Sequence, residues 1–228
     1  MHLLKFKNDY VEWVTSKKPI NYLMAVKLME ERVGLIHKAK RKELIWVLEH
    51  PSIYTAGTSA NPEELIDSKK FPVYKTGRGG RYTYHGPGQR VIYLMLDLRK
   101  RKKDVREFVR DLEGWLINSL ASLNVIGKRN SDLIGIWVEK KPASHLTGES
   151  KKIASIGIRV RKWISYHGVS ININPNLNHF NGIVPCGISE GGVTSFYSLG
   201  IKKAKNDIDT ILRQNFEKKF NRCVKIIQ

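Results

Sequence analysis

Cys186 is the residue of this sequence whose setting best suits nucleophilic chemistry. Its neighbours, Pro185 and Gly187, argue against the interior of a helix or strand. A single cysteine is more often a small buried side chain, but a loop position of this kind favours a nucleophile. Cys223, near the C-terminus, has no such setting, and we predict a structural role for it. From these residues alone we expect a cysteine enzyme that transfers acyl groups.

Two further segments contain residues that could assist this cysteine. Residues 78–89 combine glycines, which let a backbone approach a ligand closely, with arginine, tyrosine and histidine, although structural turns also explain many such loops. Residues 152–157 place Lys152 at the start of an apolar strand of small residues, where partial desolvation would free its amine for base chemistry. An exposed lysine at a strand end is the commoner case. His85 and His167 could each act as a base, and His167 could equally be structural.

The elements that must position these segments mix helices and strands. Apolar spacing predicts helices at 20–37, 104–123 and 207–220, and Asp104 with Glu107 fits a capping box at the start of the second. Strands are expected at 44–48, 72–75, 91–98, 134–138, 153–160 and 163–173, and loops at 77–88, 141–150 and 175–192. This order lacks a clean βαβ alternation. We therefore predict one α/β or α+β domain over residues 1–228, with a mixed sheet flanked by helices and a site built by loops. The inward stripe expected on the first helix consists of Leu23, Val26, Met29, Val33 and Ile36.

The composition is that of a folded protein outside the membrane. Of the 228 residues, 41% are hydrophobic and 27% charged, and no stretch approaches the ~20 apolar residues of a membrane helix. The first ten residues show no signal-peptide pattern, so we expect a cytoplasmic protein. The cysteines and histidines are not clustered, and we expect no metal site.

The net charge of +19, from 40 Lys and Arg against 21 Asp and Glu, has three interpretations. It could serve a nucleic acid, it could reflect solvated ends of helices and strands, or it could attract an acidic protein partner. The basic runs lie at 38–42, 99–103 and 159–162. Charge alone does not choose, because electrostatic steering does not depend on the identity of the polyanion.

Five short motifs, taken in order, resemble the lipoyl(octanoyl) transferase family. They are Arg-Gly-Gly at 78–80 with Thr-Tyr-His-Gly-Pro-Gly-Gln at 83–89, Lys-Ile-Ala at 152–154 with Gly157, His-Gly at 167–168, Pro-Cys-Gly-Ile at 185–188, and Gly-Val-Thr-Ser at 192–195. The resemblance covers about half of the chain. It implies the α/β catalytic domain that this family shares with lipoate and biotin protein ligases.

The resemblance also implies roles for particular residues. Cys186 corresponds to the nucleophile that carries the acyl thioester, and Lys152 to the lysine that pairs with it. Two positions depart from the family pattern: Arg81 replaces an acidic or amide residue, and Ser170 replaces the usual alanine. The positions that correspond to substrate-binding segments are Arg78, Gly79, Gly80, Arg81, Tyr82, Thr83, Tyr84, His85, Ser155, Ile156, Gly157, Gly168, Val169 and Ser170. Tyr82 and Tyr84 are expected to help exclude water from the site.

The reaction implied by the resemblance transfers an octanoyl group from octanoyl-acyl carrier protein to a lysine of a lipoyl domain. The acceptors would be lipoyl domains of 2-oxoacid dehydrogenase complexes and the glycine cleavage H protein. No cofactor, nucleic acid or membrane is expected to take part. The nearest alternative is an ATP-dependent lipoate or biotin protein ligase of the same fold, and a more distant one is a basic nucleic-acid-binding protein.

Overall fold

The computed structural model describes residues 10–139, 150–184 and 192–227. Cys186, nearly all of the predicted loop at 141–150 and part of the irregular segment at 175–192 lie outside these described residues. No described helix is long and apolar enough to cross a membrane.

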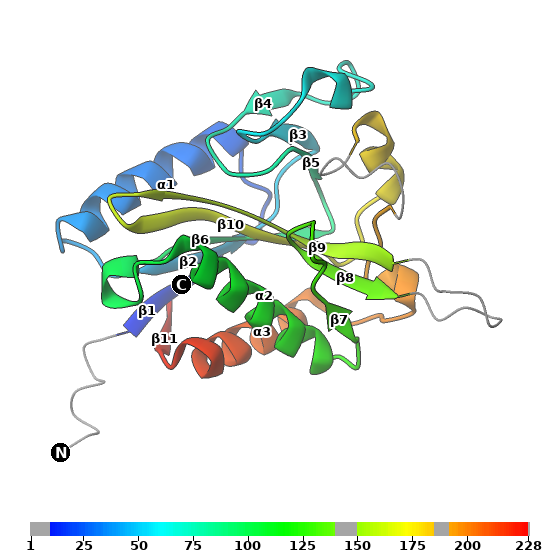
Figure 1. The fold of residues 1–228 in the computed structure, drawn as a ribbon. Helices are drawn as coiled ribbons and strands as arrows, with labels where there is room; N and C mark the ends of the chain where they lie inside the picture. Colours follow the sequence, from blue (N-terminus) through cyan, green and yellow to red (C-terminus); the bar gives the residue numbers. More distant parts are fainter. Residues whose placement is uncertain (1–9, 140–149, 185–191, 228) are drawn as a thin grey trace.

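A mixed sheet forms the centre of the fold (Figure 1). Its strands follow the order β11, β1, β2, β6, β10, β9, β8, β7. β1 pairs in parallel with β2 and β11, and the other neighbours pair antiparallel. The mixed α/β fold predicted from the sequence is thereby confirmed. The bounds are β1 (Tyr10–Thr15), β2 (Leu44–Leu48), β6 (Gln89–Met95), β7 (Gly127–Lys128), β8 (Ile136–Glu139), β9 (Ser150–Arg161), β10 (Ile164–Asn172) and β11 (Cys223–Ile227).

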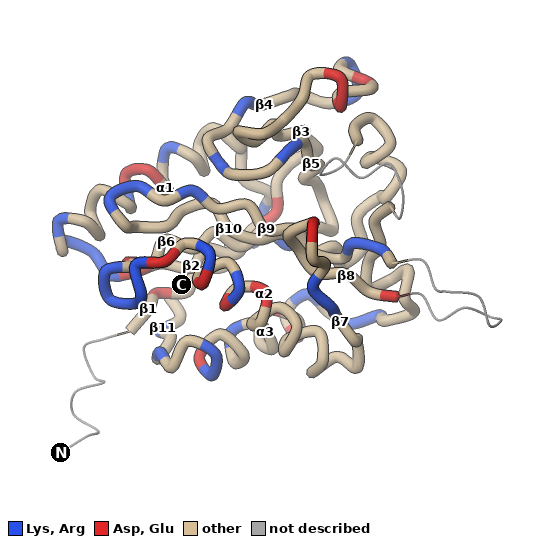
Figure 2. The backbone as a smooth tube through the Cα atoms, viewed as in Figure 1, with Lys and Arg blue, Asp and Glu red and all other residues tan. Residues whose placement is uncertain are grey.

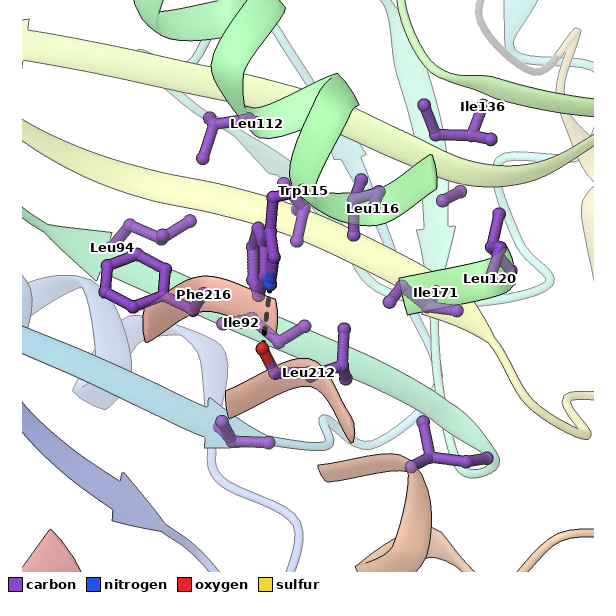
Figure 3. Packing of buried hydrophobic residues seen from close by; sticks show 14 of the residues in the cluster. Ile92, Leu94, Leu112, Trp115, Leu116, Leu120, Ile136, Ile171, Leu212 and Phe216 are labelled. Carbon is purple, nitrogen blue, oxygen red and sulfur yellow. Dashed lines mark hydrogen bonds between the residues drawn. The ribbon is translucent and has the colours of Figure 1, made fainter. Parts of the chain in front are cut away.

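Helices cover both faces of this sheet (Figure 1). On one face, α2 (Val105–Ala121) and α3 (Lys205–Phe220) pack on a large apolar core. Asp104 caps α2 as predicted, because its carboxylate accepts hydrogen bonds from the amides of Arg106 (2.8 Å) and Glu107 (3.0 Å). Trp115 joins the two helices, since its Nε1–H donates to the Leu212 carbonyl at 2.8 Å (Figure 3).

On the other face, α1 (Tyr22–His37) packs through Ala25, Met29, Val33 and Ile36. The predicted helix is confirmed, but the inclusion of Leu23 in its buried stripe was wrong. Leu23 is 59% exposed, and Tyr22 is buried instead. The buried positions are spaced by three and four residues from Tyr22, which rotates the apolar face away from Leu23.

A second, smaller sheet lies on the side of α1 (Figure 1) and consists of β4 (Val73–Lys75), β3 (Ile53–Ala56) and β5 (Tyr82–His85). The prediction that residues 77–88 are entirely loop was wrong, because β5 pairs antiparallel with β3 within that range. Long-range pairing here overrides the turn signal of the flanking glycines. β1, β3 and β11 were not predicted from the sequence, and Cys223 is exposed on β11.

The pairing of β8 with β9 contains an irregularity that matters for the site. Ile136 pairs with Ala154, but the next residue, Trp137, pairs with Lys152, so Ile153 is an extra residue in β9. Ile153 and Ala154 both belong to the core beneath α2 and α3. Because these two successive residues both face the core, the side chains before and after them lie on the opposite face of the strand. Lys152 therefore lines a cavity together with Ser155 and Gly157.

The buried ion pair between Arg90 of β6 and Asp209 of α3 provides a test of how α3 is held on the sheet. The Arg90 Nε lies 2.9 Å from Asp209 Oδ1, and both side chains are buried. We expect Asp209→Ala to lower the free energy of unfolding by about 3–5 kcal/mol, because it leaves the buried guanidinium with only a longer ion pair, to Glu49 Oε1 at 3.7 Å. Urea unfolding would measure this. Glu139→Ala, which breaks an exposed pair with Lys128, should cost about 0–1 kcal/mol, and equal losses in the two variants would contradict the assignment.

Candidate active site

A cavity of about 410 Å³ lies between the small sheet, strands β9 and β10, and the first turns of α2. Its size is within the usual range for small-molecule sites. It brings together residues from three segments that are far apart in the sequence, 78–85, 152–157 and 167–170. Of the residues predicted to bind substrate or act in catalysis, those lining it are Arg78, Gly79, Gly80, Arg81, Thr83, His85, Lys152, Ser155, Ile156, Gly157, Gly168, Val169 and Ser170.

Tyr82 and Tyr84 do not line this cavity, contrary to the role in water exclusion expected for them. Because β5 is a strand, successive side chains alternate, so Thr83 and His85 face the cavity and the two tyrosines face away. The tyrosines pack in a separate core beneath the small sheet. The Tyr84 hydroxyl lies 2.8 Å from Nδ1 of His179.

Lys152 is buried, with only 3% of its surface exposed, although it carries an amine. The extra residue in β9 turns its side chain into the cavity. There its Nζ lies 5.3 Å from the centroid of the Trp137 ring, within the range of a cation–π contact. Lys152 is therefore an amine held in a mostly apolar recess rather than an exposed lysine at a strand end.

The chain that follows Cys186 re-enters the sheet beside Lys152. The Lys152 amide donates to the Gly192 carbonyl at 3.2 Å, and the Thr194 amide donates to the Lys152 carbonyl at 3.0 Å. On the other side of Cys186, the Val184 amide donates to the Glu64 carbonyl at 2.7 Å. The described chain is thus fixed by backbone hydrogen bonds two residues before Cys186 and six residues after it.

The Arg78 guanidinium orders the loop that contains it. Its Nη2 donates to the Thr55 carbonyl and hydroxyl, both at 2.8 Å, and to the Arg81 carbonyl at 3.0 Å. The loop lies against β9, where a side chain in place of Gly157 would put its Cβ 3.1 Å from both Arg78 Cδ and the Gly79 carbonyl oxygen. A glycine at 157 therefore permits the close approach that brings the loop to the cavity. Arg81, the departure from the family pattern, forms an ion pair with Glu64 at 2.6 Å.

A chain of buried hydrogen bonds, each donated in the same direction, runs from His85 to the segment beside Lys152. Asn172 Nδ2 donates to the Thr194 carbonyl at 2.9 Å, so its Oδ1 accepts from Gln89 Nε2, also at 2.9 Å. Gln89 Oε1 lies 2.6 Å from His85 Nδ1. Since that oxygen can only accept, Nδ1 carries the proton and Nε2 is left as an acceptor for a ligand.

Burial keeps the histidines around the cavity uncharged. It lowers the pKa of His85 to about 3, and His50 and Arg78 add to the shift. Burial likewise lowers the pKa of His167 to about 3 and of His50 to about 4. His50 Nδ1 lies 2.6 Å from the Ile20 carbonyl, so it is the donor, and Nε2 accepts from the Tyr93 hydroxyl at 2.7 Å. At neutral pH the wall of the cavity presents neutral imidazoles.

Comparison with known proteins identifies the family. The model of the lipoyl protein ligase A/B catalytic domain matches residues 21–216. The chain belongs to this family. An octanoyltransferase of Parvibaculum lavamentivorans is 55% identical over 211 residues, covering 92% of this chain and 93% of that protein. An octanoyltransferase of Bartonella tribocorum is 52% identical over 223 residues, covering 96% and 91%.

Solved structures related to this A/B catalytic domain agree on the fold. A bi-partite lipoate protein ligase of Thermoplasma acidophilum superposes with a TM-score of 0.68 at 13% identity, covering 96% of this chain and 87% of that one. A biotin protein ligase of Aquifex aeolicus in complex with biotin and ATP gives 0.55 at 12% identity, covering 93% and 70%. The predicted likeness to the catalytic domain of lipoate and biotin ligases is confirmed at the level of the fold.

Several residues of this A/B catalytic domain reach the cavity without having been predicted. Tyr22 and Tyr93 contribute aromatic surface on the side of α1, and Val105 of α2, which is 39% exposed, lines the cavity as well. Val91 and Tyr93 are two positions apart and lie on one face of β6, so the two-residue period of a strand could have predicted that they lie together. Nothing in the local sequence indicates that Tyr22 and His85 line the same cavity, because this depends on the packing of α1 against the smaller sheet.

The low pKa values around the cavity predict acid sensitivity. Each histidine has an unfolded-state pKa near 6.5 and a folded value of about 3 or 4, so the unfolded chain binds more protons between these limits. The stabilisation is complete above about pH 6.5 and is lost as pH falls towards 3. We expect His85→Gln to reduce the slope of unfolding free energy against pH by up to about 1.4 kcal/mol per pH unit between pH 4 and 6. Denaturant titrations would test this, and parallel curves for the two proteins would contradict it.

Proposed function

We propose that this protein is an octanoyltransferase that moves an octanoyl group from octanoyl-acyl carrier protein to a lysine of a lipoyl domain, through a thioester on Cys186. Identity of 52–55% to octanoyltransferases over more than nine-tenths of the chain supports an acyltransferase of this specificity. The observation that carries the mechanism is the buried Lys152, which opens into the cavity and whose backbone pairs with the segment that follows Cys186.

In the first half-reaction, the Lys152 ammonium favours the thiolate of Cys186. The thiolate attacks the carbonyl carbon of the octanoyl thioester, a new carbon–sulfur bond forms, and the bond to the carrier's sulfur breaks. The carrier leaves as a thiol after taking a proton, for which Lys152 is the donor. The octanoyl chain occupies the cavity, where apolar side chains such as Val91, Val109 and Ile156 surround it.

In the second half-reaction, the amine of the lipoyl-domain lysine attacks the acyl-enzyme. An amide bond forms and the carbon–sulfur bond to Cys186 breaks. The attacking amine must lose a proton, and Lys152, neutral after the first half-reaction, accepts it. The thioester is already activated, so the scheme needs no ATP. Burial of the cavity slows hydrolysis of the intermediate, because water competes with the amine for the acyl group.

The ligase alternative shares the fold but has weaker support. The ligases superpose well, yet their sequences are only 12–13% identical to this chain, against 52–55% for the octanoyltransferases. Since one fold hosts several chemistries, the closer sequence relatives are the better guide to the reaction.

Direct observation of the intermediate tests the function. Incubation with octanoyl-acyl carrier protein, without ATP, should add one octanoyl group to the protein, and peptide mapping should place it on Cys186. Adding an unmodified lipoyl domain should then move the group to that domain's lysine. Cys186→Ser should form no thioester, and Lys152→Ala should slow both half-reactions. Transfer that appears only with free octanoate and ATP would favour the ligase reaction instead.

The distribution of charge supports acidic partners. The three basic runs, at 38–42, 99–103 and 159–162, gather at one end of the molecule (Figure 2). There Arg99 contacts His37 at 3.2 Å, and the Leu98 amide donates to the Trp163 carbonyl at 2.8 Å. Lys38, Lys40 and Lys162 are exposed on this basic end. We propose that it speeds encounter with an acidic carrier protein or lipoyl domain.

Steering of this kind depends on salt. We expect kcat/KM for octanoyl-acyl carrier protein to fall as ionic strength rises, and Lys40→Glu with Lys162→Glu to lower it about 10-fold at low salt. The difference between the two proteins should shrink at high salt. The matched control replaces Lys202 and Lys203, which are also exposed but lie in the segment before α3, away from the basic end (Figure 1). Equal effects of both pairs would show that only net charge matters.

A further inference from the structure

The residue that precedes β8 leaves the space in which the Lys152 side chain lies. Gly135 has φ +134°, a conformation that side-chain-bearing residues rarely adopt. A Cβ at this position would lie 2.4 Å from Lys152 Cε, 3.2 Å from its Nζ and 2.7 Å from the Ala154 carbonyl oxygen. Any side chain at 135 would therefore displace the end of Lys152.

Trp137 forms a second wall around the same amine. It pairs with Lys152 across β8 and β9, and its ring centroid lies 5.3 Å from Nζ. The ring is itself fixed, because it is 4% exposed and its Nε1–H donates to the Leu133 carbonyl at 3.1 Å. A tryptophan face attracts an ammonium more strongly than other aromatic rings do, and burial increases the attraction.

Both contacts follow from the extra residue in β9. That residue, Ile153, brings Trp137 opposite Lys152 and turns the lysine towards the cavity. Two carboxylates are the neighbouring charged groups. Glu113 Oε1 accepts from the Gly135 amide at 3.5 Å, and Glu113 also pairs with Arg129. Asp132 lines the cavity. The side chain of Lys152 therefore occupies the space that a side chain at Gly135 would fill, and it lies beside the ring of Trp137.

We propose that Gly135 and Trp137 are positioning residues that hold the Lys152 ammonium at the cavity, where it acts on Cys186. This role rests on the proposed function, because it assumes that Lys152 and Cys186 work together. In this assignment both residues act through Lys152, and neither acts on the acyl group. Gly135 sets where the amine can lie, and Trp137 stabilises its charged form.

The test measures the reactivity of Cys186 against pH. Iodoacetamide alkylates thiolates, so the rate of modification follows the thiolate fraction. Cys223 is exposed and would react as well, so every variant is made in a Cys223→Ser background. Loss of the ammonium contact should move the midpoint of the profile upwards by roughly 0.5–1 pH unit in Trp137→Leu, and less in Trp137→Phe, which keeps an aromatic face.

Gly135→Ala should shift the midpoint in the same direction and slow both half-reactions, because it displaces the lysine. Gly34→Ala is the matched control. A Cβ there meets no atom within 4 Å, Gly34 lies in α1 and does not line the cavity, and alkylation should be unchanged. Thermal unfolding checks that each variant is folded. If Gly135→Ala does not fold, the shifts of the midpoint in Trp137→Leu and Trp137→Phe test the proposal.

Lys152→Ala separates failure of this inference from failure of the proposed function. If Lys152→Ala shifts the midpoint but Trp137→Leu and Gly135→Ala match the parent protein, the positioning role is wrong and the catalytic pair stands. If Lys152→Ala also has no effect and no octanoyl adduct forms on Cys186, the proposed function itself fails. A graded shift, largest for Lys152→Ala and smaller for Trp137→Phe than for Trp137→Leu, is the result that supports the proposal.

Discussion

A buried amine must be held by the structure around it, because burial removes the water that would otherwise solvate it. Lys152 meets this requirement through one extra residue in β9. Without Ile153 as that extra residue, Lys152 would alternate with Ile153 and lie on the same face as Ala154, towards the apolar core. With it, the amine lies at the cavity, opposite Trp137, while the Lys152 backbone pairs with that of Gly192 and Thr194.

The histidines around the cavity are uncharged, although the charged side chains of Arg78, Arg81 and Asp132 also line it. His50, His85 and His167 have low pKa values because they are buried, and hydrogen bonds fix the proton positions of the first two. Neutral imidazoles are compatible with an acyl chain nearby, whereas imidazolium ions would require water. The chain of hydrogen bonds from His85 through Gln89 and Asn172 ends at Thr194, so the same bonds that set one tautomer also hold the segment beside Lys152.

The fold alone would not separate a transferase from a ligase. Lipoate and biotin ligases superpose on nearly the whole chain at low sequence identity. Under the proposed function, the difference lies in how the acyl group is activated. A transferase receives it as a thioester and needs a nucleophile with a nearby amine, and the residues suited to those tasks are Cys186 and Lys152. Under the same proposal, the basic end of the molecule would attract the acidic carrier protein and the acidic lipoyl domain in turn.

The sequence by itself determined the elements with strong local periodicity and the residues with distinctive chemistry. The helices at α1, α2 and α3, the cap at Asp104, and the motifs around residues 78–89, 152–157 and 167–170 could all be predicted. These features depend on neighbours within a few positions along the chain. Strands β1, β3 and β11 could not be predicted, since short strands are stabilised by partners distant in the sequence.

Only the tertiary structure decided which side chains face the cavity. Pairing of β5 with β3 sends Thr83 and His85 towards it and the two neighbouring tyrosines away, although a loop would have allowed any of them to reach it. The register between β8 and β9 likewise determines where Lys152 points. The side-chain period of a strand is two residues, so one inserted residue reverses an orientation that the local sequence leaves open.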